Sequence, residues 1–127
     1  MVILGTGIDI IEIERIRRNI ESNKHFREKI FSKNEIDYCE KKSNKAESYA
    51  ARFATKEAFF KALGTGWRDG MSFSEVEIMN NKLGKPQINL FGKAKEIAEK
   101  QNCSNIHVSI SHIKEFASAI VILEKQI

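Results

Sequence analysis

The sequence predicts an α+β fold in which a mainly antiparallel sheet packs with helices, in the order β-ααα-ββ-α-ββ. After an initial strand, apolar residues in the first half recur with a helical period, whereas in the second half they alternate with polar ones as strands do. Turn-rich links late in the chain favour hairpins. With 127 residues and one proline, we expect a single domain over residues 1–127 with no linker.

The first half of the chain is expected to be one strand followed by three helices. Met1 to Ile11 is an apolar, β-branched run with glycines at positions 5 and 7, which is typical of a buried or bending strand. Ser32 with Glu35 forms a capping-box pattern, and Gly64 stands where a helix-ending glycine belongs. The three helices are expected over residues 12–20, 32–42 and 44–63.

The second half is expected to contain two pairs of strands around one helix. Apolar and polar residues alternate from Ile106 to Ser111, as in a half-buried strand with one polar face. The segments NNKLGKP and HIKE supply the turns within the two pairs. The strands are expected over residues 73–78, 87–90, 106–111 and 116–123, and the helix over 92–101.

The composition is that of a globular protein with a mild preference for anionic partners. Hydrophobic residues make up 42% of the chain and charged residues 30%, with a net charge of +4 and a pI of about 9.1. No apolar run approaches the roughly 20 residues that span a bilayer, and the N-terminus lacks a signal-peptide pattern. Cys39 and Cys103, in expected helices, have no motif spacing and indicate packing thiols. We expect a cytoplasmic protein with no membrane partner.

Asp9 is the first residue that the fold alone does not explain. It stands in GTGIDIIEI, an acid within a run of isoleucines, and a buried carboxylate costs several kcal/mol unless it is paired or binds a metal. The other interpretation is a carboxylate at a strand end that caps the following helix. Local context leaves a functional role and a capping role equally open.

Glu57 is the second such residue. On the expected helix over 44–63 it lies beside the apolar stripe, four residues after Phe53 and three before Phe60. Lys61 follows four residues later, so an ordinary helix ion pair is one interpretation. A solvated pair belongs on the outer face of a helix, however, and the position of Glu57 therefore favours a functional acid.

Lys61 also precedes a GTG segment at the expected helix end. An ammonium group and free backbone N–H groups would suit a pyrophosphate there. Glycines at a helix end usually form only a cap and a turn, so this signal is weak by itself. It is not a Walker A loop, because the helix precedes the glycines.

The segment HVSISH, residues 107–112, carries the third cluster. On a strand, His107, Ser109 and Ser111 project to one face, which could hold a phosphate or serve catalysis. The commoner alternative is the solvated side of a half-exposed sheet. Nothing in the sequence links either histidine of this segment to an acid partner, so a serine triad has no strong candidate.

Three segments together resemble the signature regions of the holo-acyl-carrier-protein synthases. They follow the family's order along the whole chain, at the length of its small single-domain members, and the resemblance implies the 4′-phosphopantetheinyl transferase fold. Thr55 replaces a frequent alanine and leaves Glu57 and Lys61 in register. The segments are GTGIDIIEIERI at 5–16, RFATKEAFFKALGTG at 52–66 and HVSISHIKEFASAIV at 107–121.

The resemblance implies a magnesium-dependent transfer of 4′-phosphopantetheine from coenzyme A to a serine of apo-acyl carrier protein, with release of 3′,5′-ADP, for fatty acid biosynthesis. Asp9 and Glu57 would bind Mg²⁺, which prefers hard oxygen ligands. Lys61 would accompany the pyrophosphate and is a candidate acid for the leaving group. Whether Asp9 or a metal-bound water accepts the serine proton, and whether Mn²⁺ can replace Mg²⁺, is left open.

The same resemblance implies residues for coenzyme A and for the carrier protein. Arg15 matches a basic position of the first helix through which the family docks its acidic carrier. The family is typically a homotrimer with coenzyme A at subunit interfaces, which suits a chain too short to enclose such a pocket alone. The accepted carriers, the preference for free over acylated coenzyme A, and a role for His112 stay undefined. The positions that match coenzyme A contacts are Arg52, Lys61, Gly64, Thr65, His107 and Ser109.

Two other functions remain as alternatives. A magnesium enzyme acting on another nucleotide would keep Asp9, Glu57 and Lys61 but would lack the carrier-protein surface. A noncatalytic basic module would bind nucleic acid through its cations and eight phenylalanines. Lysines and arginines are interleaved with glutamates, and no basic–aromatic motif occurs, so we expect no nucleic-acid partner.

Overall fold

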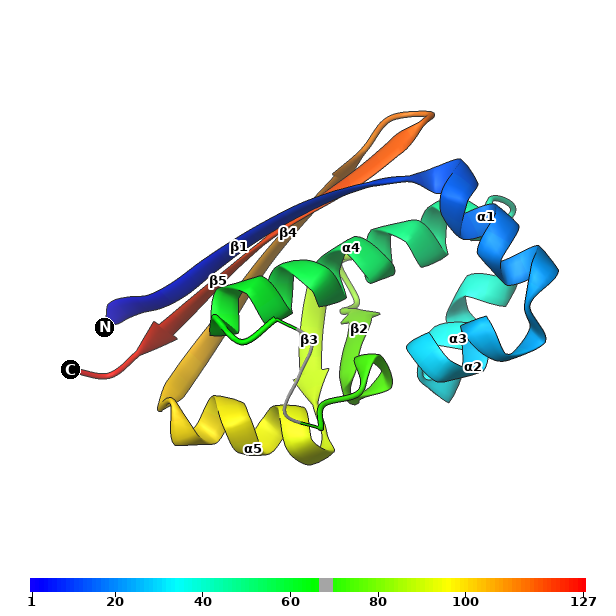
Figure 1. Ribbon diagram of the computed structural model, residues 1–127. Helices are drawn as coiled ribbons and strands as arrows, with labels where there is room; N and C mark the ends of the chain where they lie inside the picture. The colour runs from blue at the N-terminus through cyan, green and yellow to red at the C-terminus, as the bar shows by residue number, and fades with distance from the viewer. Residues whose placement is uncertain (67–69) are drawn as a thin grey trace.

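The structure is a computed structural model that describes residues 1–66 and 70–127 (Figure 1). A 3-10 turn at Phe73–Glu75 precedes the first of two late hairpins. The helices and strands are β1 (Val2–Glu12), α1 (Ile13–Ser22), α2 (Lys24–Ile30), α3 (Lys33–Glu40), α4 (Lys45–Leu63), β2 (Val76–Asn80), β3 (Pro86–Leu90), α5 (Gly92–Lys100), β4 (Cys103–His112) and β5 (Phe116–Lys125).

The α+β class and the antiparallel pairing are confirmed, with one addition to the expected order. Within residues 1–66 and 70–127, four α-helices, not three, lie between β1 and β2, because Lys24–Ile30 forms the short helix α2. The side chain of Asn23 accepts a hydrogen bond from the backbone N–H of His25 and so caps this helix. Cys103 begins strand β4 and is not in a helix, contrary to expectation.

The strands form two antiparallel sheets. The larger has the order β1-β5-β4, and the smaller is the hairpin β2-β3. In the larger sheet Gly7 pairs with Val121, which pairs in turn with Val108, so these three side-chain positions share one face. The neighbouring row, Ile8, Ile120 and Ser109, lies on the opposite face. This alternation separates an inner face from an outer face.

The inner face packs against α4, which lies between the large sheet and the hairpin β2-β3 (Figure 1). Two glycines let the strand backbone approach the helix: a Cβ at Gly7 would lie 1.9 Å from the carbonyl oxygen of Ala58, and one at Gly5 would lie 2.0 Å from that of Ala62. The core between them is apolar, with Ala119, Val121 and Leu123 of β5 buried. Close contact between β1 and α4 positions the next inward residue of the strand, Asp9, beside the helix.

The part of the outer face formed by β1 and β5 is largely apolar and uncovered in the single chain. Ile8 and Ile10 are each 66% exposed, and Phe116 and Ile120 extend this surface onto β5. Exposed aliphatic residues on a continuous sheet face are typical of a surface that packs against another protein. Within residues 1–66 and 70–127, no helix combines the length and apolar character needed to cross a bilayer.

A buried ion pair ties α3 and the hairpin to α4. The Nζ atom of Lys56 lies 2.8 Å from Oε1 of Glu35, and both side chains are fully buried. The ammonium also donates to the carbonyl oxygens of Phe73 and Val76, while Oε2 of Glu35 accepts the N–H of Ile78. These bonds satisfy both charges, as burial requires. The predicted capping box of Ser32 and Glu35 is present as well.

Candidate active site

Asp9 and Lys61 meet where β1 crosses α4. The Nζ atom of Lys61 lies 3.0 Å from Oδ1 of Asp9 and 2.9 Å from the carbonyl oxygen of Ile8. The Asp9 side chain is largely buried, with 16% of it exposed, whereas Lys61 is 53% exposed. Strand alternation points Asp9 toward the helix after Gly5 and Gly7, which is why the two side chains meet. Asp9 is therefore not simply a helix cap.

Glu57 lies one turn before Lys61 on α4 and is partly buried. Burial raises the pKa of its carboxyl group, and the negative charge of Asp9 raises it further. The cations of Lys61 and Arg15 act in the opposite direction and do not cancel the effect. Glu57 and Asp9 thus repel each other across a site with too little positive charge.

Arg15 is an exposed residue in the first turn of α1. Its charge acts on Glu57, which places the guanidinium within electrostatic reach of the carboxylate pair. The basic position expected to dock a partner therefore adjoins the acidic cluster.

The glycines after α4 form a helix cap. Gly64 has a φ of 79°, and its N–H donates to the carbonyl oxygen of Lys61. The N–H of Gly66 donates to the carbonyl oxygen of Phe60, and the hydroxyl of Thr65 donates to that of Gly66. The C-cap interpretation of this segment is confirmed, and the N–H groups of Gly64 and Gly66 are already used by the helix. A coenzyme contact through Gly64 and Thr65 stays a prediction.

Arg52 is only 4% exposed and makes a full set of internal contacts. Its guanidinium donates to the carbonyl oxygen of Ile78, to Ser48 and to Oδ1 of Asn80. It also lies 4.3 Å from the ring centroid of Tyr38, a cation–π contact. In this conformation Arg52 ties α4 to β2, so its expected role as a ligand of a coenzyme phosphate stays a prediction.

His107 and Ser109 lie on the outer face of the large sheet, away from Asp9. Across the sheet, Ser109 lies in one row with Ile8, and His107 lies in one row with Thr6; both rows belong to the outer face. Asp9 instead lies in one row with the buried Ala119, on the inner face. The structure therefore brings together Asp9, Glu57 and Lys61 but separates His107 and Ser109 from them within one chain.

His107 has an acidic partner that sequence reasoning missed. Its Nε2 atom lies 2.7 Å from Oε1 of Glu124 on β5, and this hydrogen bond lowers the pKa of Glu124. His112 likewise has Glu47 at 3.4 Å. Glu124 and His107 share one outer face, so strand register could have suggested their pairing, but the register was not known from the sequence.

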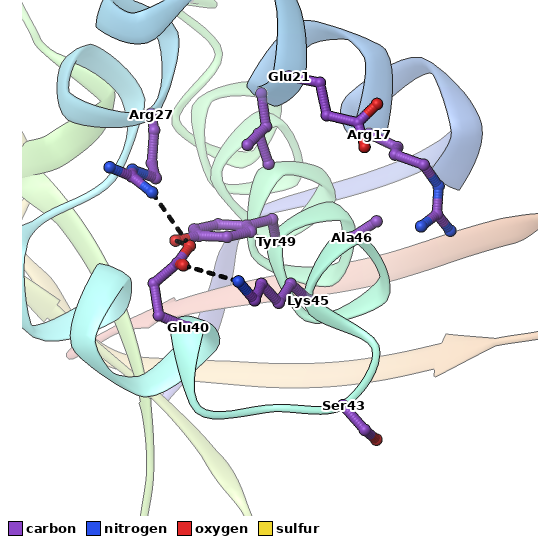
Figure 2. A pocket seen from close by; sticks show the side chains of 9 residues that line it. Arg17, Glu21, Arg27, Glu40, Ser43, Lys45, Ala46 and Tyr49 are labelled. Carbon is purple, nitrogen blue, oxygen red and sulfur yellow. Dashed lines mark hydrogen bonds and ion pairs between the residues drawn. The ribbon is translucent and has the colours of Figure 1, made fainter.

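Several hollows among the described residues lie outside the carboxylate cluster, and two of them contain charged residues of interest. One, of about 540 Å³, runs along the edge of β4 beside β3 and is lined by His107 and Lys85. The other, of about 450 Å³, lies among α1 to α4 (Figure 2). In the second, the carboxylate of Glu40 accepts the Tyr49 hydroxyl at 2.6 Å and pairs with Arg27 and Lys45. Because its central charges are already paired, we assign that second hollow no ligand.

The donor set at the cluster suits a hard divalent cation. Among the described residues no group of three or more histidine, cysteine or acidic side chains is arranged to hold a metal ion. Asp9 and Glu57 alone would leave most positions of an octahedral ion to water and substrate oxygens, as Mg²⁺ prefers. Burial, and after it the negative charge of Asp9, raises the pKa of Glu57, and a bound dication would stabilise the charged carboxylate against both effects.

Comparison with known proteins identifies the family. The chain matches the 4′-phosphopantetheinyl transferase superfamily over residues 5–121. A holo-[acyl-carrier-protein] synthase of Geobacter metallireducens is 46% identical over 98% of this chain and 99% of its own length. The crystal structure of the corresponding Neisseria meningitidis synthase has a TM-score of 0.88 at 35% identity, covering 98% of this chain and 100% of that one.

A further solved structure adds a ligand. The synthase from Bacillus anthracis, in complex with CoA (3′,5′-ADP), has a TM-score of 0.82 at 39% identity and covers 99% of this chain and 100% of that one. The chain belongs to the 4′-phosphopantetheinyl transferase superfamily. It is an enzyme of the transferase class, as the signature segments predicted, and not a noncatalytic binding module.

Proposed function

We propose that this protein transfers 4′-phosphopantetheine from coenzyme A to a serine of apo-acyl carrier protein, for fatty acid biosynthesis. The observation that carries the proposal is the cluster of Asp9, Glu57 and Lys61, in a chain that is similar over its full length to holo-[acyl-carrier-protein] synthases. We further propose that residues 1–127 act as one domain in the cytoplasm, where the two free cysteines would stay reduced.

The reaction exchanges the phosphoanhydride bond of the coenzyme A pyrophosphate for a phosphoester bond to the serine of the carrier. The serine oxygen of the carrier attacks the phosphorus that bears pantetheine, and the bond from that phosphorus to 3′,5′-ADP breaks. The serine proton goes to Asp9, directly or through a water, and Lys61 balances the charge of the pyrophosphate. Asp9 and Glu57 would hold Mg²⁺, which supplies further charge neutralisation when bound.

The position of the expected coenzyme A contacts His107 and Ser109 supports a site shared between subunits. His107 and Ser109 lie on the outer face, where the apolar patch of Ile8 and Ile120 would pack against another copy. We propose a homotrimer in which these two residues of one subunit contact the coenzyme A held by the cluster of its neighbour. Arg52, Gly64 and Thr65 are proposed as contacts of coenzyme A phosphates, which for Arg52 requires a change in its internal hydrogen bonds.

The experiment that tests the function is transfer to a carrier. The protein is incubated with coenzyme A, Mg²⁺ and an apo-acyl carrier protein, and the mass of the carrier is measured. Asp9→Asn and Glu57→Gln should each abolish the mass increase, while Asp37→Asn, an exposed acid on α3, should leave it unchanged. No transfer to any cognate carrier by the folded wild type would refute the proposal. Transfer or cleavage with another nucleotide alone would favour the alternative magnesium enzyme.

The carrier-docking surface has a separate test. Arg15→Gln should raise the KM for the carrier protein and leave the affinity for coenzyme A nearly unchanged, with a wild-type KM that rises with salt. Arg17→Gln is the matched control, because Arg17 is held by Glu14 at 3.1 Å. An unchanged KM for Arg15→Gln would remove Arg15 from the docking surface.

A further inference from the structure

The single ammonium group of Lys61 contacts Asp9 and is also the proposed partner of the coenzyme pyrophosphate. Its Nζ atom donates to Asp9 Oδ1 at 3.0 Å and to the carbonyl oxygen of Ile8 at 2.9 Å. Two of its three hydrogens are therefore directed to β1. The same ammonium is the proposed partner of the coenzyme pyrophosphate, and the same Asp9 carboxylate is a proposed ligand of the metal.

Lys61 forms its close ion pair with Asp9 of β1 and not with Glu57 of its own helix. Glu57 precedes Lys61 by four residues, the favourable order for a pair along one helix, yet the close contact of Lys61 is with Asp9 across to the strand. Because β1 lies directly on α4 at Gly5 and Gly7, Asp9 is held within reach of the lysine. A dication bound to Asp9 would thus lie next to an ammonium that the fold keeps there, and like charges repel.

We propose that Lys61 couples the binding of the divalent cation to the binding of the pyrophosphate. With no anion bound, the ammonium opposes a metal ion at Asp9. A pyrophosphate draws the ammonium toward itself and so removes a competing positive charge from the Asp9 carboxylate. Such coupling is reciprocal, so the metal favours the anion by the same factor. This inference rests on the proposed metal and coenzyme A site, and it adds a reason for the two ligands to bind together.

The direct test uses Mn²⁺ as the probe and needs no carrier protein or turnover. Binding of Mn²⁺ to the full chain is measured by electron paramagnetic resonance in the absence of coenzyme A. Lys61→Met should bind Mn²⁺ at least about fivefold more tightly than wild type, the lower end of common coupling factors. Lys45→Met removes the same charge at the other end of α4 and should not change the affinity. Asp9→Asn should abolish binding in both backgrounds.

A second measurement isolates the coupling. The affinity for coenzyme A is determined with Mn²⁺ and with EDTA, in wild type and in Lys61→Met. Direct contact between metal and pyrophosphate persists in both proteins, so a smaller metal effect in Lys61→Met reports the contribution of Lys61. Circular dichroism verifies that each variant is folded. We expect Lys61→Met to fold because the Lys61 side chain is exposed.

The outcomes separate this inference from the proposed function. Equal Mn²⁺ affinity of Lys61→Met and wild type, or an equal metal effect on coenzyme A, overturns the coupling even if transfer to the carrier is normal. Tighter Mn²⁺ binding with a reduced metal effect supports the coupling even if no carrier tested is a substrate.

Discussion

Gly7 illustrates how one residue sets the geometry of the site. A Cβ at this position would meet the carbonyl oxygen of Ala58 at 1.9 Å and the backbone nitrogen of Ala62 at 2.8 Å, both shorter than real contacts. The strand can lie on the helix only because neither Gly5 nor Gly7 has a side chain. Asp9, two residues further, then reaches Lys61. The glycines of β1 therefore serve the site through the strand–helix distance.

Gly7→Ala should destabilise the protein by at least about 1–3 kcal/mol, because the backbone of β1 must move away from α4. The measurement is the free energy of unfolding in urea. Thr6→Ala, on the exposed outer face of the same strand, is the control and should stay within about 0.5 kcal/mol of wild type. Equal stability of the two variants would show that β1 does not press on the helix as described.

For single residues, the sequence predicted which side chains lie at the candidate site better than it predicted which of them contact each other. Asp9 and Glu57 were recognisable as acids in apolar surroundings, and their proximity to Lys61 is confirmed. Helix spacing suggested that Lys61 would pair with Glu57, whereas it pairs with Asp9. That choice depends on how closely β1 approaches α4, a tertiary distance that no local pattern contains.

Among the elements, α4 carries the most constraints. Arg52 and Lys56 both anchor it to β2, and Lys56 also joins it to α3 through Glu35. Because Glu57 follows Lys56 directly, these anchors set the rotation of the helix that presents Glu57 to β1. The capping box identified Glu35 from sequence, but its second role as the partner of a buried lysine joins residues 21 positions apart and could not be read locally.

Lys56→Met should lower the free energy of unfolding by about 3–5 kcal/mol, because Glu35 would then be a buried charge without its partner. Chemical denaturation measures the loss. The double variant Glu35→Gln/Lys56→Met should lose less than the sum of the two single changes, since it leaves no unpaired charge. Strict additivity would mean that the two groups do not stabilise each other.

Glu40 links α3 to α2 and to the start of α4 (Figure 2). The hydrogen bond from Tyr49 lowers the pKa of Glu40, and Lys45 and Arg27 lower it further against the effect of burial. A folded pKa below the unfolded value means that the unfolded chain binds more protons between the two values. The stabilisation is therefore complete above the unfolded pKa of about 4.5 and is lost as the pH falls through the folded pKa.

Glu40→Gln should accordingly reduce the free energy of unfolding by about 1–2 kcal/mol near pH 7, and by less near pH 3. Urea titrations at the two pH values give the comparison. Asp37→Asn, exposed on the same helix, should show no such pH-dependent difference. A loss of equal size at both pH values would indicate that the charge of Glu40 is unimportant.

From the sequence we expected neither the helix α2 nor the 3-10 turn over Phe73–Glu75, whose residues were assigned to a strand over 73–78. Helix α2 has only seven residues, and one of them, Ile30, is buried. Its position depends on aromatic packing, in which Phe26 stacks on Phe53 of α4 at 6.3 Å and meets Phe31 edge-on. A helix this short has little intrinsic stability, so its tertiary contacts decide its conformation and a periodic pattern cannot.

For the whole molecule, the division of the large sheet into two faces matters most. Alternation in HVSISH indicated one polar face, and His107 and Ser109 do share it. The sequence did not indicate that this face opposes Asp9, because strand order and register follow from long-range pairing. The apolar half of the outer face, on β1 and β5, supports the proposed self-association.

Ile8→Lys should disperse the proposed homotrimer into folded monomers, because a charge on the apolar outer face would be buried between subunits. Size-exclusion chromatography with light scattering measures the mass, and circular dichroism verifies the fold. Leu83→Lys, at an exposed hairpin position, is the matched control and should keep the wild-type mass. A wild type that is monomeric at micromolar concentration would contradict the proposed assembly.

The opposed faces of the sheet have a genetic consequence. If one subunit supplies Asp9 and its neighbour supplies His107, then Asp9→Asn and His107→Ala damage different halves of each shared site. Two variants with little activity of their own should complement each other when co-expressed, because about a quarter of the interfaces in randomly mixed trimers would contain both intact residues. A sheet that carries Asp9 on one face and His107 on the other thus makes catalytic competence a property of pairs of chains, which mixtures of the two variants can restore.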